Sequence, residues 1–309
     1  MALSDSFAPG RRLIATLAFL VAVSPLQADP LDLKPGDHIG IVGNTLADRM
    51  QHDGWLETYF HTRFPKHDLV FRNLGFSGDE LTLRLRSAAF GTPDEWLTRT
   101  QTDVVFAFFG YNESFAGKAG LDKFKKDLET FIQHTTTQKY NGKSSARLVL
   151  FSPIAHENLK DRNLPDGKEN NVRLELYTAT MAAVAKANGV PFVDLFHATK
   201  APYATSTEPM TINGVHLNAK GNELVARLID EALYPNDEVK RETAPTEAVR
   251  KTVKEKNFYW FNRYRTTDGY SIFGGRADLA FVGGQTNRIV AQREQPTIGR
   301  QGQRVALLP

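Results

Sequence analysis

Polar residues that could carry out acyl-transfer chemistry gather in four short motifs of this sequence. Thr45 supplies a hydroxyl that could attack a carbonyl, and His216 supplies an imidazole that could take the hydroxyl proton and return it to a leaving alcohol. Backbone N–H groups and amide side chains in the same motifs could stabilise the resulting oxyanion, at about 3–4 kcal/mol for each donor. The motifs are Gly43-Asn44-Thr45-Leu46, Asn73-Leu74-Gly75-Phe76-Ser77-Gly78-Asp79, Gly110-Tyr111-Asn112-Glu113 and Asn213-Gly214-Val215-His216-Leu217-Asn218.

The elements that must position these motifs alternate between strands and helices. β-branched and aromatic runs predict strands at His38–Val42, Asp68–Leu74, Thr102–Phe109, Arg147–Ser152 and Val190–Leu195. Apolar residues at helical spacing lie between these runs, and further helices are predicted from about Asn171 to Asn188 and from about Ala219 to Leu233. The pattern is typical of an α/β fold, a three-layer doubly wound sheet of about five parallel strands. Three motifs then fall at carboxyl ends of strands, where such sheets bind ligands, and the fourth precedes the last helix.

The four motifs, in this order, resemble the conserved blocks of the SGNH (GDSL-type) hydrolase family over roughly residues 37–234. Those blocks are Gly-Asp-Ser-Leu, a Ser-Gly-Asp-like turn, Gly-x-Asn-Asp and Asp-x-x-His. The resemblance implies a flavodoxin-like SGNH fold and hydrolysis of an acyl ester. It places the nucleophile at Thr45, the oxyanion hole at Gly78 and Asn112, and the base at His216. The stretches Thr45–Trp55 and Asn257–Arg276 look like a planctomycete-type exported subgroup of the family.

The chain departs from the family pattern at three positions of the site. Thr45 stands where the family has serine, and its extra methyl group restricts χ1 and crowds the attack. Asn213 stands where the family has aspartate, and the equivalent change in a serine protease lowers kcat by about 10⁴. Asn44 also replaces an aspartate, which takes no part in proton transfer. For Thr45 alone, the alternative role is an N-cap of the following helix.

Two residues after the fourth predicted strand could compensate for the missing carboxylate. His156 and Glu157 should overhang the same edge of the sheet as the motifs. The hypothesis is that one of them lines the pocket and supplies charge or orientation to His216; the alternative is a solvated loop.

Two functions are therefore open. One is an ester hydrolase acting on a small-molecule or carbohydrate ester. The other is a catalytically impaired SGNH-fold protein that binds a ligand or partner in the same pocket, which Thr45 and Asn213 favour. No cofactor is expected, and no His, Asp and Glu cluster has metal-ligand spacing.

Composition narrows the class and the compartment. The 309 residues are 41% apolar and 24% charged, as in an ordinary globular protein, and the net charge of +3 gives no indication of nucleic-acid binding. Arg11 and Arg12 precede a short apolar run, Leu13–Val23, which predicts a signal peptide over residues 1–28 and export to a bacterial periplasm or exterior. That run is too short to span a bilayer, so no membrane span is expected after cleavage. The absence of cysteine excludes disulfides and thiolate-ligated metals.

The predicted organisation is a signal peptide over 1–28, a hydrolase-like domain over 29–235 and a C-terminal extension over 236–309. The extension has a polar connector at Pro235–Pro245, a basic helix at Ala248–Lys256 and an aromatic segment at Asn257–Tyr264. We expect the aromatic segment to pack on the domain and cover apolar surface; stacking on nucleic-acid bases is the alternative. The last residues are expected to be frayed, and the sequence leaves the oligomeric state open.

Overall fold

The fold is taken from a computed structural model that describes residues 31–84, 91–264, 278, 280–282 and 285–286. The predicted signal peptide over 1–28, the glycine-rich stretch from Gly269 apart from a few residues, and the end expected to be frayed lie outside the described residues.

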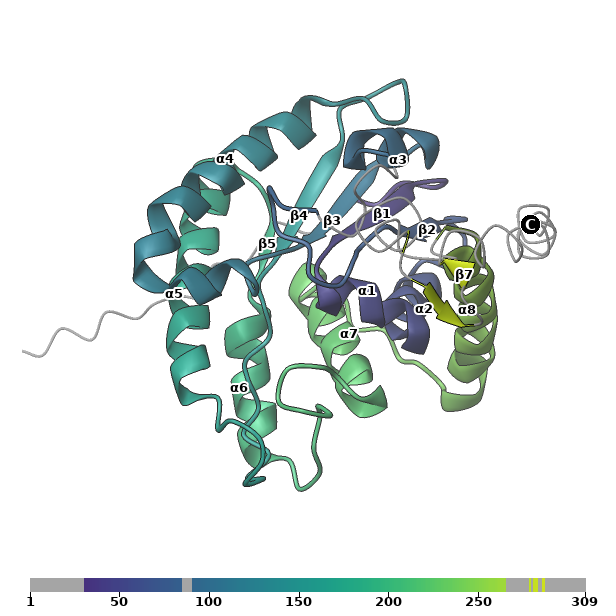
Figure 1. Cartoon of the computed structure of the whole chain (residues 1–309). Helices are drawn as coiled ribbons and strands as arrows, with labels where there is room; N and C mark the ends of the chain where they lie inside the picture. Colours follow the sequence, from purple (N-terminus) through teal and green to yellow (C-terminus); the bar gives the residue numbers. More distant parts are fainter. Residues whose placement is uncertain (1–30, 85–90, 265–277, 279, 283–284, 287–309) are drawn as a thin grey trace, which may run out of the picture.

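The core is a five-stranded parallel sheet in the order β2-β1-β3-β4-β5. This is the flavodoxin-like order, so the predicted α/β doubly wound fold is confirmed (Figure 1). The strand order reverses between β1 and β3, which are direct neighbours in the sheet. The strands are β1 (His38–Gly43), β2 (Val70–Asn73), β3 (Val104–Phe108), β4 (Arg147–Phe151) and β5 (Phe192–Val193).

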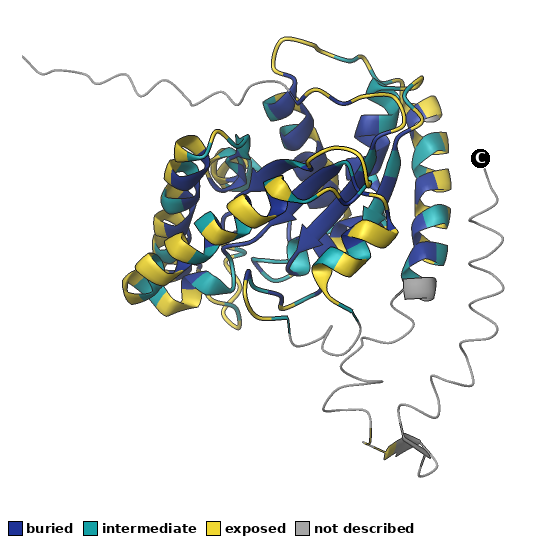
Figure 2. Cartoon of the chain, turned by 90° about the horizontal axis from the view of Figure 1, so that it is seen from above, coloured by how far each residue is buried: buried dark blue, intermediate teal, exposed yellow. Residues whose placement is uncertain are grey.

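The central strands are continuous apolar runs because both of their faces are covered. All five residues of β3, Val-Val-Phe-Ala-Phe, are buried. Two apolar clusters result, one on each face of the sheet. Ile39 and Ile41 of β1 belong to the first, whereas Val105 and Ala107 of β3 belong to the second. Figure 2 shows the buried strands between layers of helix whose outer faces are exposed.

Helices α1, α2 and α7 pack on the first face of the sheet, and α4 and α5 pack on the second. The elements are α1 (Thr45–Asp53), α2 (Trp55–Arg63), α3 (Pro93–Arg99), the 3₁₀ helix η2 (Glu113–Gly120), α4 (Leu121–Thr137), α5 (Lys168–Ala187), α6 (Leu195–Thr205), α7 (Ala219–Leu233) and α8 (Thr243–Tyr264). A short hairpin of β6 (Ala280–Val282) and β7 (Gln285–Thr286) follows.

The helical periodicity predicted between the first two strands belongs to two helices. Gly54 separates α1 from α2 in a left-handed conformation, φ 73°, and its N–H donates to the carbonyl of Met50. That conformation strains other residues, so glycine ends the first helix here. The chain turns at this residue while the apolar spacing continues.

The C-terminal extension differs from the prediction in where its helix begins. Helix α8 starts at Thr243, so the polar connector is shorter than predicted, and the aromatic segment continues the same helix to Tyr264. It packs along α1 and α2 (Figure 1). Trp260 is buried in this contact, and its indole N–H donates to the carbonyl of Asn73, 2.8 Å away. The helices of the described residues include none with the length and apolar character needed to cross a membrane.

Candidate active site

The hydroxyl motif lies where β1 turns into α1. Asn44, not Thr45, is the N-cap of α1: its side-chain oxygen accepts the N–H of Leu46 at 3.1 Å. The backbone N–H of Asn44 donates to Phe108 at the end of β3, which joins the ends of the two strands. The capping alternative for Thr45 is therefore wrong. Thr45 is the first residue of the helix, and its hydroxyl is not used for capping.

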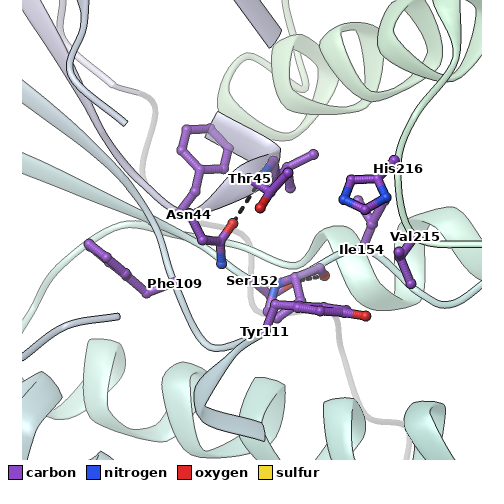
Figure 3. Close-up of a pocket in the computed structure, with 11 residues that line it drawn as sticks. Asn44, Thr45, Phe109, Tyr111, Ser152, Ile154, Val215 and His216 are labelled. Atoms are coloured by element: carbon purple, nitrogen blue, oxygen red, sulfur yellow. Dashed lines mark hydrogen bonds between the residues drawn. The ribbon is translucent and has the colours of Figure 1, made fainter. Parts of the chain in front are cut away.

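Thr45 and His216 line one cavity of about 40 Å³ beyond the carboxyl ends of β1, β3 and β4. This is the edge at which the strand order reverses and where doubly wound sheets bind ligands. No hydrogen bond joins the two side chains, both of which the structure describes. Figure 3 shows most of the lining residues, which are Asn44, Thr45, Leu46, Phe108, Phe109, Tyr111, Ser152, Pro153, Ile154, Val215 and His216.

Asn213 fixes the tautomer of His216. The side-chain oxygen of Asn213 accepts the backbone N–H of His216 at 3.0 Å and that of Val215 at 3.3 Å. The oxygen is thereby oriented toward the ring, and it lies 3.0 Å from Nδ1 of His216. Because that oxygen can only accept, Nδ1 carries the proton and Nε2 keeps a lone pair. This is the tautomer that a general base needs, so Asn213 orients the imidazole as an aspartate would, without supplying charge.

The electrostatic surroundings of His216 favour its neutral form. Burial lowers the pKa of His216 below its usual value, and the positive charge of Arg49 lowers it further. A base is active when it is unprotonated, so His216 is ready to accept a proton at neutral pH.

Three donors predicted for an oxyanion hole have no acceptor within the described part of the chain: the N–H of Thr45, the N–H of Gly78 and the amide of Asn112. Thr45 N–H is one of the unpaired donors at the start of α1. Gly78 has φ +91°, a conformation that favours glycine, and a Cβ there would meet no protein atom within 4 Å. Asn112 precedes η2 and is partly exposed. Gly78 and Asn112 lie outside the small cavity itself.

Two carboxylates, those of Asp48 and Glu113, join the motifs to one another. Asp48 of α1 accepts the N–H of Ser77 at 3.0 Å as well as its hydroxyl. Glu113 accepts the N–H of Leu81 at 3.0 Å and that of Gly110 at 2.9 Å. The turn that carries Gly78 is thus held from both sides, by the helix of Thr45 and by the motif of Asn112. The motifs alone do not predict these connections, although Glu113 lies inside the third motif.

Glu157 holds the loop that carries the histidine. Its buried carboxylate accepts the N–H groups of Met210 and Thr211 and the hydroxyl of Thr211. Its own N–H donates to Gly214, between Asn213 and His216. Glu157 does not line the cavity, and the charge that acts on His216 is that of Arg49.

His156 is also buried outside the cavity. Its Nδ1 lies 3.1 Å from the amide of Asn170, and its ring fills the space where a side chain at position 214 would lie. Both residues therefore contact the histidine loop rather than the imidazole.

Ser152 is a second hydroxyl that lines the cavity. Its oxygen accepts the N–H groups of Leu195 and Phe196 at 2.8 and 3.0 Å, and its proton is donated to the carbonyl of Pro153. Because these bonds fix both its proton and its lone pairs, Ser152 has a structural role at the start of α6. Among the described residues, no group of three or more His, Asp and Glu is placed to hold a metal ion.

A sequence model of the GDSL-like Lipase/Acylhydrolase family matches residues 39–224. The chain belongs to this family. The match contains all four motifs and ends within α7, so α8 lies beyond it. No curated protein matches the sequence at a significant level.

Solved structures similar to this chain include esterases and other hydrolases of low sequence identity, which support the fold. Axe2, an acetylxylan esterase from Geobacillus stearothermophilus, is 17% identical, with a TM-score of 0.52 over 69% of this chain and 100% of its own. LAE5, an α/β hydrolase from the metagenome of Lake Arreo, Spain, is 17% identical, with a TM-score of 0.52 over 67% and 99%. BT4096, a gut microbial diltiazem-metabolizing enzyme, is 17% identical, with a TM-score of 0.53 over 67% of this chain and 48% of its own. The chain thus spans about half the length of BT4096.

Proposed function

We propose that the protein is an ester hydrolase that removes short acyl groups, with Thr45 as nucleophile and His216 as base. The observation that carries the proposal is the contact of Asn213 with His216: the Asn213 oxygen accepts a hydrogen bond from Nδ1, which leaves the lone pair of Nε2 free beside the cavity that Thr45 lines. Membership of the GDSL-like family supports ester hydrolysis as the reaction class.

The reaction follows from the roles of these groups. Nε2 of His216 takes the proton of Thr45 as its oxygen attacks the acyl carbon. The oxyanion is stabilised by the N–H groups of Thr45 and Gly78 and by the amide of Asn112, which have no other acceptor in the described structure. The imidazolium returns its proton to the leaving alcohol, and water then cleaves the acyl–threonine ester in the same way.

The lining of the cavity favours a short apolar acyl group. Most of this lining is apolar and includes Phe108, Phe109 and Ile154. We expect the methyl of an acetyl ester to pack against these side chains. The acetylxylan esterase among the similar structures makes acetylated carbohydrate a reasonable substrate class. The signal-like first 28 residues support an exported enzyme.

The proposal is tested with the purified protein, p-nitrophenyl acetate and butyrate, and a panel of acetylated sugars. Thr45→Ala and His216→Ala should each lower kcat/KM by at least about a hundredfold, the lower end of what a positioned acid–base group contributes. Thr130→Ala and His134→Ala are the matched controls, because these residues are exposed on α4, away from the cavity. Acetate should be hydrolysed faster than butyrate.

Equal background rates in wild type and in both site variants would overturn the proposal. That result would favour the alternative, a protein that keeps the pocket and binds a ligand there without turnover. Asn213 and Thr45 are the residues on which this second function rests, since both weaken a serine-type mechanism.

A further inference from the structure

Arg49 lies on the exposed side of α1, one turn beyond the proposed nucleophile. Residues four apart on a helix share a face, with Cβ atoms about 5–6 Å apart. Helical side chains generally lean toward the N-terminus, which would bring the guanidinium of Arg49 toward the turn that carries Thr45. The electrostatic effect of Arg49 on His216 agrees with this placement.

The charge of Arg49 is not neutralised within the described structure. The Arg49 side chain makes no hydrogen bond, ion pair or ring contact within the described part of the chain. The carboxylates in and beside the site motifs have other partners: Asp48 binds Ser77, Asp79 pairs with Arg84, and Glu113 accepts two backbone N–H groups. An unpaired, exposed cation is therefore available one helical turn from Thr45.

The site also lacks a negative charge next to His216. Proton transfer from Thr45 converts His216 into a cation, and Asn213 offers that cation a neutral oxygen. The charge that acts on His216 from the surroundings is also positive. An anion bound to Arg49 would cancel that positive field and supply the negative charge that the site lacks.

We propose that the natural substrate is an acyl ester whose alcohol part carries a carboxylate, and that Arg49 binds this carboxylate. The inference rests on the proposed function and names its substrate class. The alcohol, rather than the acyl group, carries the charge because the mainly apolar lining of the cavity would desolvate a carboxylate without pairing it. Arg49 is thus a specificity residue. Hydrolysis remains balanced: ester and water give a carboxylic acid and the carboxylate-bearing alcohol, with Thr45 and His216 returned to their starting states.

The test compares two esters that differ in charge, 3-acetoxybenzoate and 3-acetoxybenzamide. Rates are measured with the full-length protein at about pH 8, above the usual titration range of histidine. Wild type should prefer the carboxylate over the amide in kcat/KM. Arg49→Gln should lower this ratio about three- to fivefold, as expected for loss of one exposed ion pair, and Arg49→Lys should keep most of it. Lys186→Gln, an exposed cation at the opposite edge of the sheet, should leave the ratio unchanged. The preference should weaken as salt is added.

Equal kcat/KM values for the two esters in wild type, or a parallel fall of both in Arg49→Gln, would overturn the inference while leaving the hydrolase proposal intact. A second measurement separates the two proposals if neither ester is turned over. Binding of 3-acetamidobenzoate and 3-acetamidobenzamide, which resist hydrolysis, is then measured by calorimetry in wild type and in Arg49→Gln. Tighter binding of the anion that depends on Arg49 supports the anion site without the reaction, and equal binding rejects it.

Discussion

At the scale of single residues, Asn213 separates two duties that a triad aspartate performs together. It orients His216 and fixes the proton on Nδ1, because its oxygen is itself held by two backbone N–H groups. It does not supply the charge that stabilises an imidazolium. The large penalty of the equivalent change in a serine protease reflects a wrong tautomer. In this site only the charge is missing.

Asn213→Asp should therefore raise activity and change its pH dependence. The carboxylate would favour the imidazolium and raise the pKa of His216, which burial and Arg49 hold low in the wild type. Since the base works unprotonated, the acid limb of kcat/KM should lie at lower pH in the wild type and move to higher pH in the variant. Above that limb, kcat should rise about tenfold, the equivalent of one pKa unit or ~1.4 kcal/mol. Rates with p-nitrophenyl acetate across pH measure both effects.

Glu157→Gln is the comparison for this prediction, because Glu157 contacts the same loop without touching the imidazole. Glu157→Gln should destabilise the protein without shifting the acid limb of kcat/KM to higher pH. An unchanged limb in Asn213→Asp would show that another group already compensates the imidazolium.

The residue types of the site could be predicted from the sequence, but the hydrogen bonds that hold these residues in place could not. The hydroxyl, the imidazole and the amide donors lie in short motifs. The bond from Asp48 to Ser77 joins residues 29 apart, and that from Glu157 to Thr211 joins residues 54 apart. Local patterns contain no information about such contacts, because only the folded sheet brings them together. For the same reason capping could be considered as an alternative role for Thr45, while the geometry gives that role to Asn44.

At the scale of elements, α8 supports the helix and turn that hold the site. Trp260 donates to the carbonyl of Asn73, whose side-chain amide donates to Ala47 at 2.7 Å, two residues beyond Thr45. Asn257 of α8 donates to the carbonyl of Gln51, which lies in α1 like Ala47. Two short hydrogen-bonded routes therefore run from α8 to α1.

Trp260→Phe keeps the apolar ring and removes the indole donor. The buried carbonyl of Asn73 loses this partner, so the free energy of unfolding should fall by about 1–3 kcal/mol. If α8 positions α1 as well as stabilising it, kcat should fall while KM changes little. Urea denaturation and steady-state kinetics measure the two effects. Glu255→Gln, exposed on the same helix, should stay within about 0.5 kcal/mol of wild type. Wild-type stability in Trp260→Phe would contradict a bracing role for α8.

The elements themselves were predictable where burial dictates composition. β3 is apolar throughout, and β1 and β4 are apolar after their first residues, because helices cover both faces of the sheet; all three strands were predicted. At the edge, β5 has only two residues, although a longer run was predicted. The start of α8 was missed because Pro245 suggested a connector, yet proline is tolerated in the first turn of a helix.

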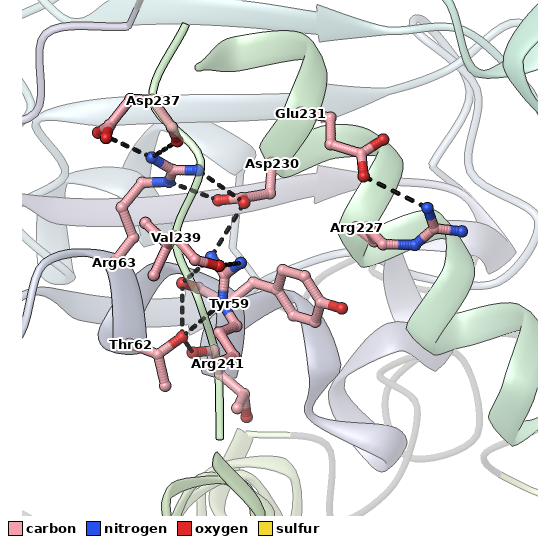
Figure 4. A network of polar contacts seen from close by, with 10 residues as sticks. Tyr59, Thr62, Arg63, Arg227, Asp230, Glu231, Asp237, Val239 and Arg241 are labelled. Carbon is pink, nitrogen blue, oxygen red and sulfur yellow. Dashed lines mark hydrogen bonds and ion pairs between the residues drawn. The ribbon is translucent and has the colours of Figure 1, made fainter. Parts of the chain in front are cut away.

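At the scale of the whole molecule, a buried ionic network fixes the connector that leads to α8. Asp230 of α7 accepts from Arg63 of α2 at 2.7 and 2.8 Å and from Arg241 of the connector at 2.9 Å (Figure 4). The side chains of Arg63 and Asp230 are 2% and 3% exposed. Arg63 also binds Asp237. One carboxylate therefore serves two arginines from separate parts of the chain.

Asp230→Asn should lower the free energy of unfolding by about 3–5 kcal/mol, because it leaves two largely buried cations without their shared charge. Its neighbour provides the control: Glu231 pairs with Arg227 on the exposed side of α7, with both side chains about half exposed. Glu231→Gln should change stability by less than about 0.5 kcal/mol. Denaturant unfolding of both variants measures the difference. An equal fall in the free energy of unfolding would show that the buried network contributes no more stability than the exposed ion pair.

The position of α8 beyond residue 224 has a consequence for how this protein can be dissected. A fragment cut at the family boundary would strip the indole from Asn73 and uncover Glu57, whose buried carboxylate binds Lys256 and Asn257. The carbonyl of Asn73 and the carboxylate of Glu57 would then lose the partners that α8 provides. We therefore expect the shortest stably folded form of this protein to extend past residue 224 and to include α8. A chimaera joined at residue 224 would lose the hydrogen bonds by which α8 supports α1.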